Sequence, residues 1–223
     1  MRLILLPVLI LCAIMVSSCE ISNKEQTKII EVYNEPMHKL VFQKGDVKIL
    51  DVQLKPHDTT LYHLHRNPFF YVSLDWQKDA AQLLNGRWST YSPSWAKGEV
   101  DCDTSFVTKP IVHRATNGGD LKSRLIGILN MGNGRTLVSN LKGFEISNRW
   151  FRSSRLLLNK GDTIECKTVD FPVVLVVVKG TKYKLIQNNQ IVSSDKDWVY
   201  LEQPYMLTNT GDTLEMIKIE VLK

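Results

Sequence analysis

Three of the five histidines in this 223-residue chain lie between residues 57 and 74, in the sequence HDTTLYHLHRNPFFYVSL. His63 and His65 are one residue apart in a segment typical of a β-strand, where side chains i and i+2 point to the same face. Both imidazoles must therefore point together, either into the core or into solvent. An inward pair is suited to binding a metal ion, whereas an exposed or hydrogen-bonded pair would need no ligand.

The N-terminus indicates where the protein works. It reads MRLILLPVLILCAIMVSSCE, a basic residue and a short apolar run followed by small residues and Cys19. The run is too short for a comfortable membrane span, so residues 1–18 are predicted to be a signal peptide. The segment VSSC resembles the lipobox of bacterial lipoproteins, which implies a lipidated Cys19. The alternative is an ordinary secretory signal that is cut nearby.

The resemblance to a lipoprotein implies a bacterial cell-envelope protein that is held to a membrane by its lipid alone. Glu20 stands where inner-membrane lipoproteins commonly carry Asp, so the outer membrane, facing the periplasm, is favoured. Residues 19–30 include the polar segment SNKEQTK and are predicted to form a tether between the lipid and the first strand.

Composition excludes several classes of function. The chain has 28 Lys and Arg against 23 Asp and Glu, a net charge of +5, and no run of basic residues, so nucleic acid is not a predicted partner. With Cys12 in the predicted leader and Cys19 lipidated, only Cys102 and Cys166 remain, too few for a disulfide framework. The sequence leaves open a single bridge between them.

The remaining sequence is typical of an all-β protein. Turn motifs such as QKGD, NGGD, NKGD and NTGD recur between short runs rich in β-branched residues, and no long stretch has a helical period. The run FPVVLVVV at 171–178 predicts a strand that is buried on both faces, at a contact between domains.

The chain contains an internal repeat. Residues 54–74 align with residues 158–178 at an offset of 104. Residues 110–129 also match residues 204–222, where Asn117 meets Asn209 at an offset of 92. The difference predicts about twelve extra residues in the first half, and we place them in residues 77–99. Two tandem domains of one fold are therefore expected.

Each half resembles a cupin, a small double-stranded β-helix barrel of jelly-roll type. His63-Leu64-His65 corresponds to the His-x-His of the first cupin motif, and Pro110 to His113 with Asn117 corresponds to the second. The resemblance implies a bicupin, with an N-terminal cupin domain at 31–130 and a C-terminal one at 131–223. In the second half Lys167, Val169 and Tyr205 stand at the histidine positions, so that domain is predicted to be degenerate, with Lys167 pointing inward.

The resemblance also implies a divalent metal ion, Fe, Mn, Ni or Zn, held by His63, His65 and His113. The glutamate of the cupin motif falls on Phe69 or Phe70, so the site resembles the three-histidine variant of thiol dioxygenases. Three neutral imidazoles leave the metal charge uncompensated, which favours an anionic or chelating ligand. Phe69, Phe70 and Trp88 are predicted to line the substrate pocket.

Aromatic residues are frequent in the segment between the two motifs: Trp76, Trp88, Tyr91 and Trp95. They could cover the pocket as a lid or stacking surface, or pack one barrel against the other, and we favour packing. His57 aligns with Gly161 and is predicted to be a turn residue. His38, in the segment EPMHKL, belongs to no recognised constellation of site residues and is predicted to lie at the surface.

Function follows from the site rather than from the fold. A metal-dependent oxygenase acting on a small molecule is one hypothesis. A module that binds a small ligand such as a sugar without turnover, or a structural pair of barrels, is the alternative. The resemblance to cupins also makes a homodimer possible.

Overall fold

The computed structural model describes residues 28–136 and 142–223. The predicted signal peptide, Cys19 and most of the predicted tether lie outside the described residues. Within the described part, no helix has the length and apolar character that crossing a bilayer requires.

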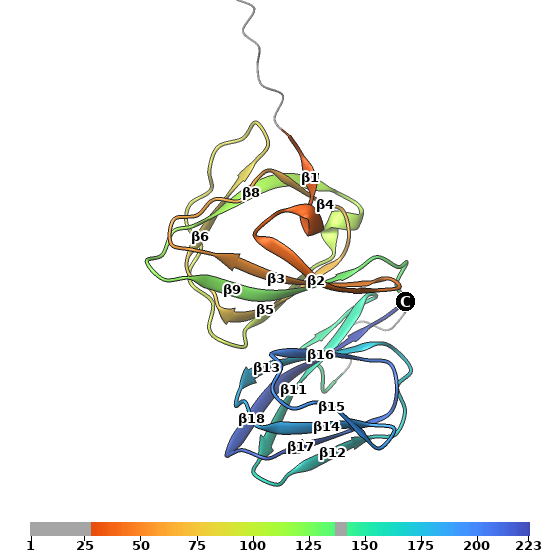
Figure 1. The fold of residues 1–223 in the computed structure, drawn as a ribbon. Helices are drawn as coiled ribbons and strands as arrows, with labels where there is room; N and C mark the ends of the chain where they lie inside the picture. The colour runs from red at the N-terminus through yellow and green to blue at the C-terminus, as the bar shows by residue number, and fades with distance from the viewer. Residues whose placement is uncertain (1–27, 137–141) are drawn as a thin grey trace, which may run out of the picture.

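The chain folds into two β-barrels, one from each half of the sequence (Figure 1). In the first, a sheet of order β1-β4-β8-β6 faces one of order β2-β3-β9-β5-β7. Its elements are β1 (Ile30–Glu31), η1 (Val32–Asn34), β2 (His38–Lys44), β3 (Val47–Leu54), β4 (His63–His65), β5 (Phe69–Asp75), β6 (Asp79–Leu83), β7 (Val100–Asp103), η2 (Ser105–Val107), β8 (Ile111–Asn117) and β9 (Ser123–Asn130).

The second barrel has the same plan. A sheet of order β10-β11-β18-β13-β16 faces one of order β12-β17-β14-β15. Its strands are β10 (Ile146–Ser147), β11 (Phe151–Asn159), β12 (Thr163–Cys166), β13 (Val173–Lys179), β14 (Tyr183–Gln187), β15 (Gln190–Ser193), β16 (Trp198–Leu201), β17 (Tyr205–Asn209) and β18 (Thr213–Val221). The all-β bicupin architecture expected from the sequence is confirmed.

The two five-stranded sheets pack against each other between the barrels (Figure 1). Alternation along each strand explains how, because odd and even residues of one strand enter different cores. On β5, Phe70 and Val72 belong to the core between the barrels, whereas Phe69 belongs to the core of the first barrel. On β13, Val174 and Val176 face β5 and its neighbours. The predicted burial of FPVVLVVV on both faces, at the contact between domains, is confirmed.

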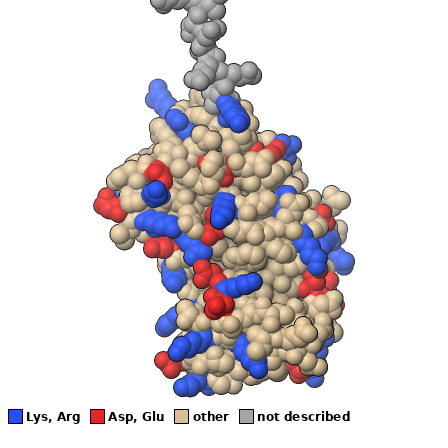
Figure 2. All heavy atoms as spheres, viewed as in Figure 1, with Lys and Arg blue, Asp and Glu red and all other residues tan. Residues whose placement is uncertain are grey.

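Charged residues surround this apolar contact. The guanidinium of Arg124 on β9 lies 2.9 Å from Asp51 of its own barrel and 2.8 Å from Asp197 of the other. Figure 2 shows basic and acidic side chains interspersed over the visible face rather than gathered into one field. Ion pairs of this kind contribute little to the free energy of unfolding, because both partners remain partly in water. Their main effect is on the orientation of the two barrels.

The repeat is visible in corresponding turns. His57 and Gly161 both adopt positive φ, 64° and 85°. Their amides donate to the carbonyls of Asn117 and Asn209, at 3.1 and 2.9 Å. Because a non-glycine residue seldom adopts this conformation, His57 is held by the turn, and the prediction of a turn residue is confirmed.

The position assigned to Lys167 is wrong. In the first barrel, His63 on β4 pairs with His113 on β8. In the second barrel, Tyr205 corresponds to His113, and Tyr205 pairs with Cys166. Cys166 therefore occupies the position of His63, because the first half has one more residue ahead of β4 than the constant offset allows. The Lys167 side chain is 78% exposed and points to solvent. Cys102 and Cys166 are free thiols, one in each barrel.

Candidate metal centre

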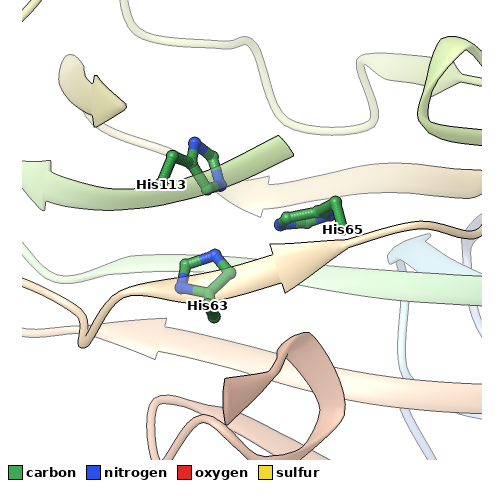
Figure 3. A group of neighbouring side chains, drawn as sticks. All are labelled: His63, His65 and His113. Carbon is green, nitrogen blue, oxygen red and sulfur yellow. The ribbon is translucent and has the colours of Figure 1, made fainter. Parts of the chain in front are cut away.

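The three predicted histidines meet inside the first barrel (Figure 3). His63 and His65 point inward from β4, and His113 points inward from the neighbouring β8, directly opposite His63 in the ladder. One nitrogen from each ring lies within 4.8 Å of the others. The ring centroids are 4.7–5.0 Å apart. Two adjacent antiparallel strands thus bring three imidazoles from distant positions to one point.

Several nitrogens of this triad are buried without a hydrogen-bond partner. Nδ1 of His63 is 2.8 Å from the Leu61 carbonyl oxygen, which fixes the proton on that nitrogen. Nε2 of His63 and both ring nitrogens of His65 have no partner among the described residues. Buried polar atoms are normally hydrogen-bonded. The lone pair of His63 Nε2 is therefore available to a metal ion, and the same holds for one nitrogen of His65.

The site keeps its imidazoles neutral. Burial lowers the pKa of His63 to about 3, with further lowering by charge on His38 and His113. Burial, followed by charge on His113 and His63, lowers the pKa of His65 well below its ordinary value. Burial also lowers the pKa of His113 to about 4. Neutral imidazole is the form that binds metal ions, so the triad is ready to bind at neutral pH.

These depressed pKa values predict how stability depends on pH in the metal-free protein. Below pH 6.5 the unfolded chain takes up protons at His63 and His113, which the folded chain takes up only near pH 3 and 4. The free energy of unfolding should therefore fall as the pH drops from 6.5 to 4, by up to about 1.4 kcal/mol per pH unit for each histidine. Urea unfolding at several pH values measures this slope. His63→Gln/His113→Gln should flatten it and His57→Asn should not; an equal slope in both variants would contradict the assignment.

A fourth histidine and a buried glutamate lie beside the triad, and sequence reasoning missed both. His38 is 8% exposed, so its predicted surface position is wrong. Its ring centroid is 4.6 Å from that of His63. Its Nδ1 is 2.7 Å from Glu35 Oε2. The Glu35–x–x–His38 spacing is the signal that could have revealed the pair, because η1 ends at Asn34 and the turn that follows it brings both side chains into contact.

Glu35 is held as a carboxylate by this contact. Burial alone would raise its pKa, but hydrogen bonds and charge from His38, and the backbone amides of Leu61 and Met37, lower it overall. The Leu61 amide donates to Oε1 at 3.1 Å, and Leu61 is also the residue whose carbonyl binds His63. Glu35 therefore orients both the His38 ring and the segment that fixes the tautomer of His63.

The triad opens into a cavity of about 310 Å³ inside the first barrel. Phe69 lines this cavity, as predicted. Phe70 and Trp88 do not, and these predictions are wrong. Phe70 points away into the core between the barrels, since it is next to Phe69 on a strand. Trp88 is 40% exposed and stacks on Arg114 outside the barrel.

Other aromatic residues of the predicted insert form the cavity wall. Trp76 and Trp95 both line it, and a β-bridge joins them. Tyr71 lies between Phe69 and Trp95, with ring centroids 4.4 and 6.3 Å away. None of the insert's four aromatic residues belongs to the core between the barrels. The favoured prediction of inter-barrel packing is therefore wrong, and Trp76 and Trp95 line the cavity instead.

The extra residues of the first half lie in two places, both beside the cavity. The difference in residue number between corresponding strands of the two barrels is 104 for β5 and β13, 98 for β7 and β16, and 92 for β8 and β17. Six extra residues thus precede β7 and six follow it, so the predicted placement within residues 77–99 is half right. The first segment carries Trp95 into the cavity. The second contains η2, whose Phe106 ring is 4.7 Å from that of His65.

Comparison with solved structures identifies the fold. A Cupin 2 conserved barrel domain protein from Leptotrichia buccalis matches with a TM-score of 0.54 and 11% identity, covering 82% of this chain and 86% of that one. The 223-residue chain therefore has a cupin fold. No family model and no curated protein matches the sequence.

Two enzymes share this bicupin architecture. A salicylate 1,2-dioxygenase from Pseudaminobacter salicylatoxidans has a TM-score of 0.57 and 10% identity, covering 79% of this chain and 71% of that one. The oxalate decarboxylase of Bacillus subtilis, which has Mn(II) centres, has a TM-score of 0.53 and 9% identity, covering 79% and 69%. At this identity the likeness concerns the fold, and the chemistry of the present chain must be argued from its own residues.

Proposed function

We propose that this protein binds a divalent metal ion through His63, His65 and His113 and uses it to act on a small molecule in the cavity of the first barrel. The observation that carries the proposal is the set of buried imidazole nitrogens that have no hydrogen-bond partner within residues 28–136 and 142–223. Without a bound ligand the burial of these nitrogens has no explanation, because each buried polar atom without a hydrogen-bond partner lowers the free energy of unfolding. The ligand set of three histidines suits Fe, Mn, Ni or Zn.

A bound divalent ion would supply Lewis-acid or redox chemistry at the inner end of the cavity. The chain's own residues prepare that point. Phe69 and Phe106 lie against the His65 ring, at centroid distances of 5.5 and 4.7 Å, and exclude water from it. Glu35 holds the proton on Nδ1 of His38, so Nε2 is the nitrogen that remains for a ligand in the cavity.

Among activities, we favour an oxygenase. The cavity places apolar walls around the triad, which suits chemistry that water would divert, and a dioxygenase is among the structures with this fold. Binding of a small ligand such as a sugar without turnover is the second candidate, and the aromatic walls at Trp76 and Trp95 favour it. A redox-active ion retained through purification would support the first, and a redox-inert ion the second.

The proposed setting is the bacterial cell envelope, with Cys19 lipidated and residues 19–30 as the tether. Support comes from the sequence VSSC after an apolar leader, and from the first described strand, which begins at Ile30, the last residue of the proposed tether. A lipid anchor would hold the barrels near a membrane without a spanning segment. Incorporation of labelled palmitate by the unmodified chain, and its loss in Cys19→Ala, would test this part alone.

The decisive experiment is metal analysis of the purified protein beside two variants. We expect close to one metal ion per chain in the unmodified protein and almost none in His63→Ala/His113→Ala. His57→Asn is the matched control, because it removes an exposed histidine and preserves a turn that Asn tolerates. Near-stoichiometric metal in the double variant, or none in the unmodified protein after loading with Fe, Mn, Ni and Zn in turn, would refute the proposal.

A further inference from the structure

The cavity that contains the triad also contains an unusual set of charges. Three carboxylates line it, Asp79, Asp101 and Asp103, and neither lysine nor arginine is among its lining residues. His38, which also lines it, is paired with the buried Glu35 carboxylate. The lining therefore has a net negative charge, and no side chain in it could neutralise an anionic substrate.

The carboxylates come from different elements. Asp79 begins β6, and its carboxylate accepts a hydrogen bond from the Ser92 hydroxyl. Asp103 ends β7, and its Oδ1 accepts from the Ser105 amide at 2.8 Å and from its hydroxyl at 2.6 Å. Asp79 and Asp103 are half-buried, so a ligand in the cavity would meet charges that water screens only in part.

Aromatic rings form much of the remaining wall. Phe69, Tyr71, Trp76 and Trp95 line the same cavity as the carboxylates. The faces of such rings attract organic cations, most strongly where the cation leaves water. Aromatic faces combined with carboxylates are the features expected for recognition of an ammonium group attached to an apolar body.

The unpartnered nitrogens of the triad provide a second, independent indication that the cavity receives a ligand. His65 is 3% exposed, lines the cavity and has both ring nitrogens without a partner among the described residues. A divalent ion on three neutral imidazoles would offset two of the three carboxylate charges and leave the cavity negative. The negative charge of the cavity reverses the expectation from the sequence that the ligand would be anionic. That expectation did not include the aspartates, because no sequence motif places them near the histidines.

We propose that the cavity selects an organic ammonium ion with an apolar or aromatic body, and that Asp79 and Asp103 are the residues that set this preference. The ligand would occupy the cavity of the proposed metal site, so its conversion rests on the proposed function. Its charge preference depends on the aspartates and is measured without metal, because a carboxylate probe would itself coordinate a bound ion.

Three probes of similar size and shape test the preference: 2-phenylethylammonium, 3-phenylpropanol and 3-phenylpropionate. Calorimetric titration of the metal-free protein should show the ammonium binding at least tenfold more tightly than the carboxylate, with the alcohol between them. In Asp79→Asn/Asp103→Asn the advantage of the ammonium should fall at least tenfold. Asp120→Asn is the control, because that carboxylate is almost fully exposed outside the cavity.

Circular dichroism and thermal unfolding would establish that the variants fold. Equal or tighter binding of the carboxylate, an unchanged ammonium preference in the double variant, or no ammonium binding at millimolar concentration would overturn the assignment. Metal content is measured separately on the same samples. Failure of metal binding with ammonium selectivity intact would refute only the proposed function, and loss of selectivity with metal retained would refute only the ligand class.

Discussion

Replacement of His65 by leucine should make the metal-free protein more stable and should abolish its stabilisation by metal. His65 is 3% exposed and has two ring nitrogens without a partner among the described residues. Burying such atoms costs about 1–3 kcal/mol each when they stay unpaired. Leucine has no polar atom and would pack against the rings of Phe69 and Phe106, which lie beside His65.

Metal should stabilise only the unmodified protein. A ligand that binds only the folded state at 1,000 times its Kd adds about 4 kcal/mol to the free energy of unfolding. The unmodified protein should gain an amount of this order when zinc is added, and His65→Leu should gain almost nothing. The stability order of the two proteins would then reverse between chelator and zinc, which general damage to the fold would not produce.

Urea unfolding with EDTA and with zinc provides the measurement. His57→Asn, which removes an exposed histidine, should follow the unmodified protein under both conditions. If His65→Leu were less stable than the unmodified protein in EDTA, the nitrogens of His65 would have partners inside the protein. If it kept the full response to zinc, His65 would not be a ligand.

The repeat predicted one fold twice, and the resemblance to the two cupin motifs predicted the triad. Two halves at fixed offsets require one fold twice, and the strand period sends His63 and His65 to one face. Pairing of β4 with β8 then brings His113 opposite His63. These relationships are local, or they repeat in the second half, where the sequence can be checked against itself.

What the sequence did not predict depends on tertiary placement. Glu35 and His38 reach the site only because η1 and β2 turn inward beside the triad, a contact without a counterpart among the described residues of the second barrel. The aspartates of the cavity lie in the first half alone, next to the two added segments. Deciding which of Phe69 and Phe70 faces the cavity needed the strand register. The motif placed its glutamate position only to within one residue, and a shift of one residue reverses the faces of a strand.

Phe70→Ala should be among the most destabilising substitutions in the chain and should leave the metal site intact. Phe70 is fully buried between the barrels, with its ring 5.5 Å from that of Phe151 in the other barrel. Truncation of a buried phenylalanine costs about 3–5 kcal/mol, since contacts are lost and a cavity remains. The lost contacts join the two barrels, so each barrel should begin to unfold at its own denaturant concentration.

Phe69→Ala is the matched comparison, because the same side chain is removed one residue away on the opposite face. Phe69 lies on the cavity side, and its ring fills the space that a Cβ on Gly127 would occupy, 2.3 Å from that atom. Its removal should change affinity for zinc or for 2-phenylethylammonium, whereas Phe70→Ala should change neither. Unfolding followed by tryptophan fluorescence, with metal content measured in parallel, separates the two effects. Loss of metal from Phe70→Ala at unchanged stability would show that the faces of β5 are assigned the wrong way round.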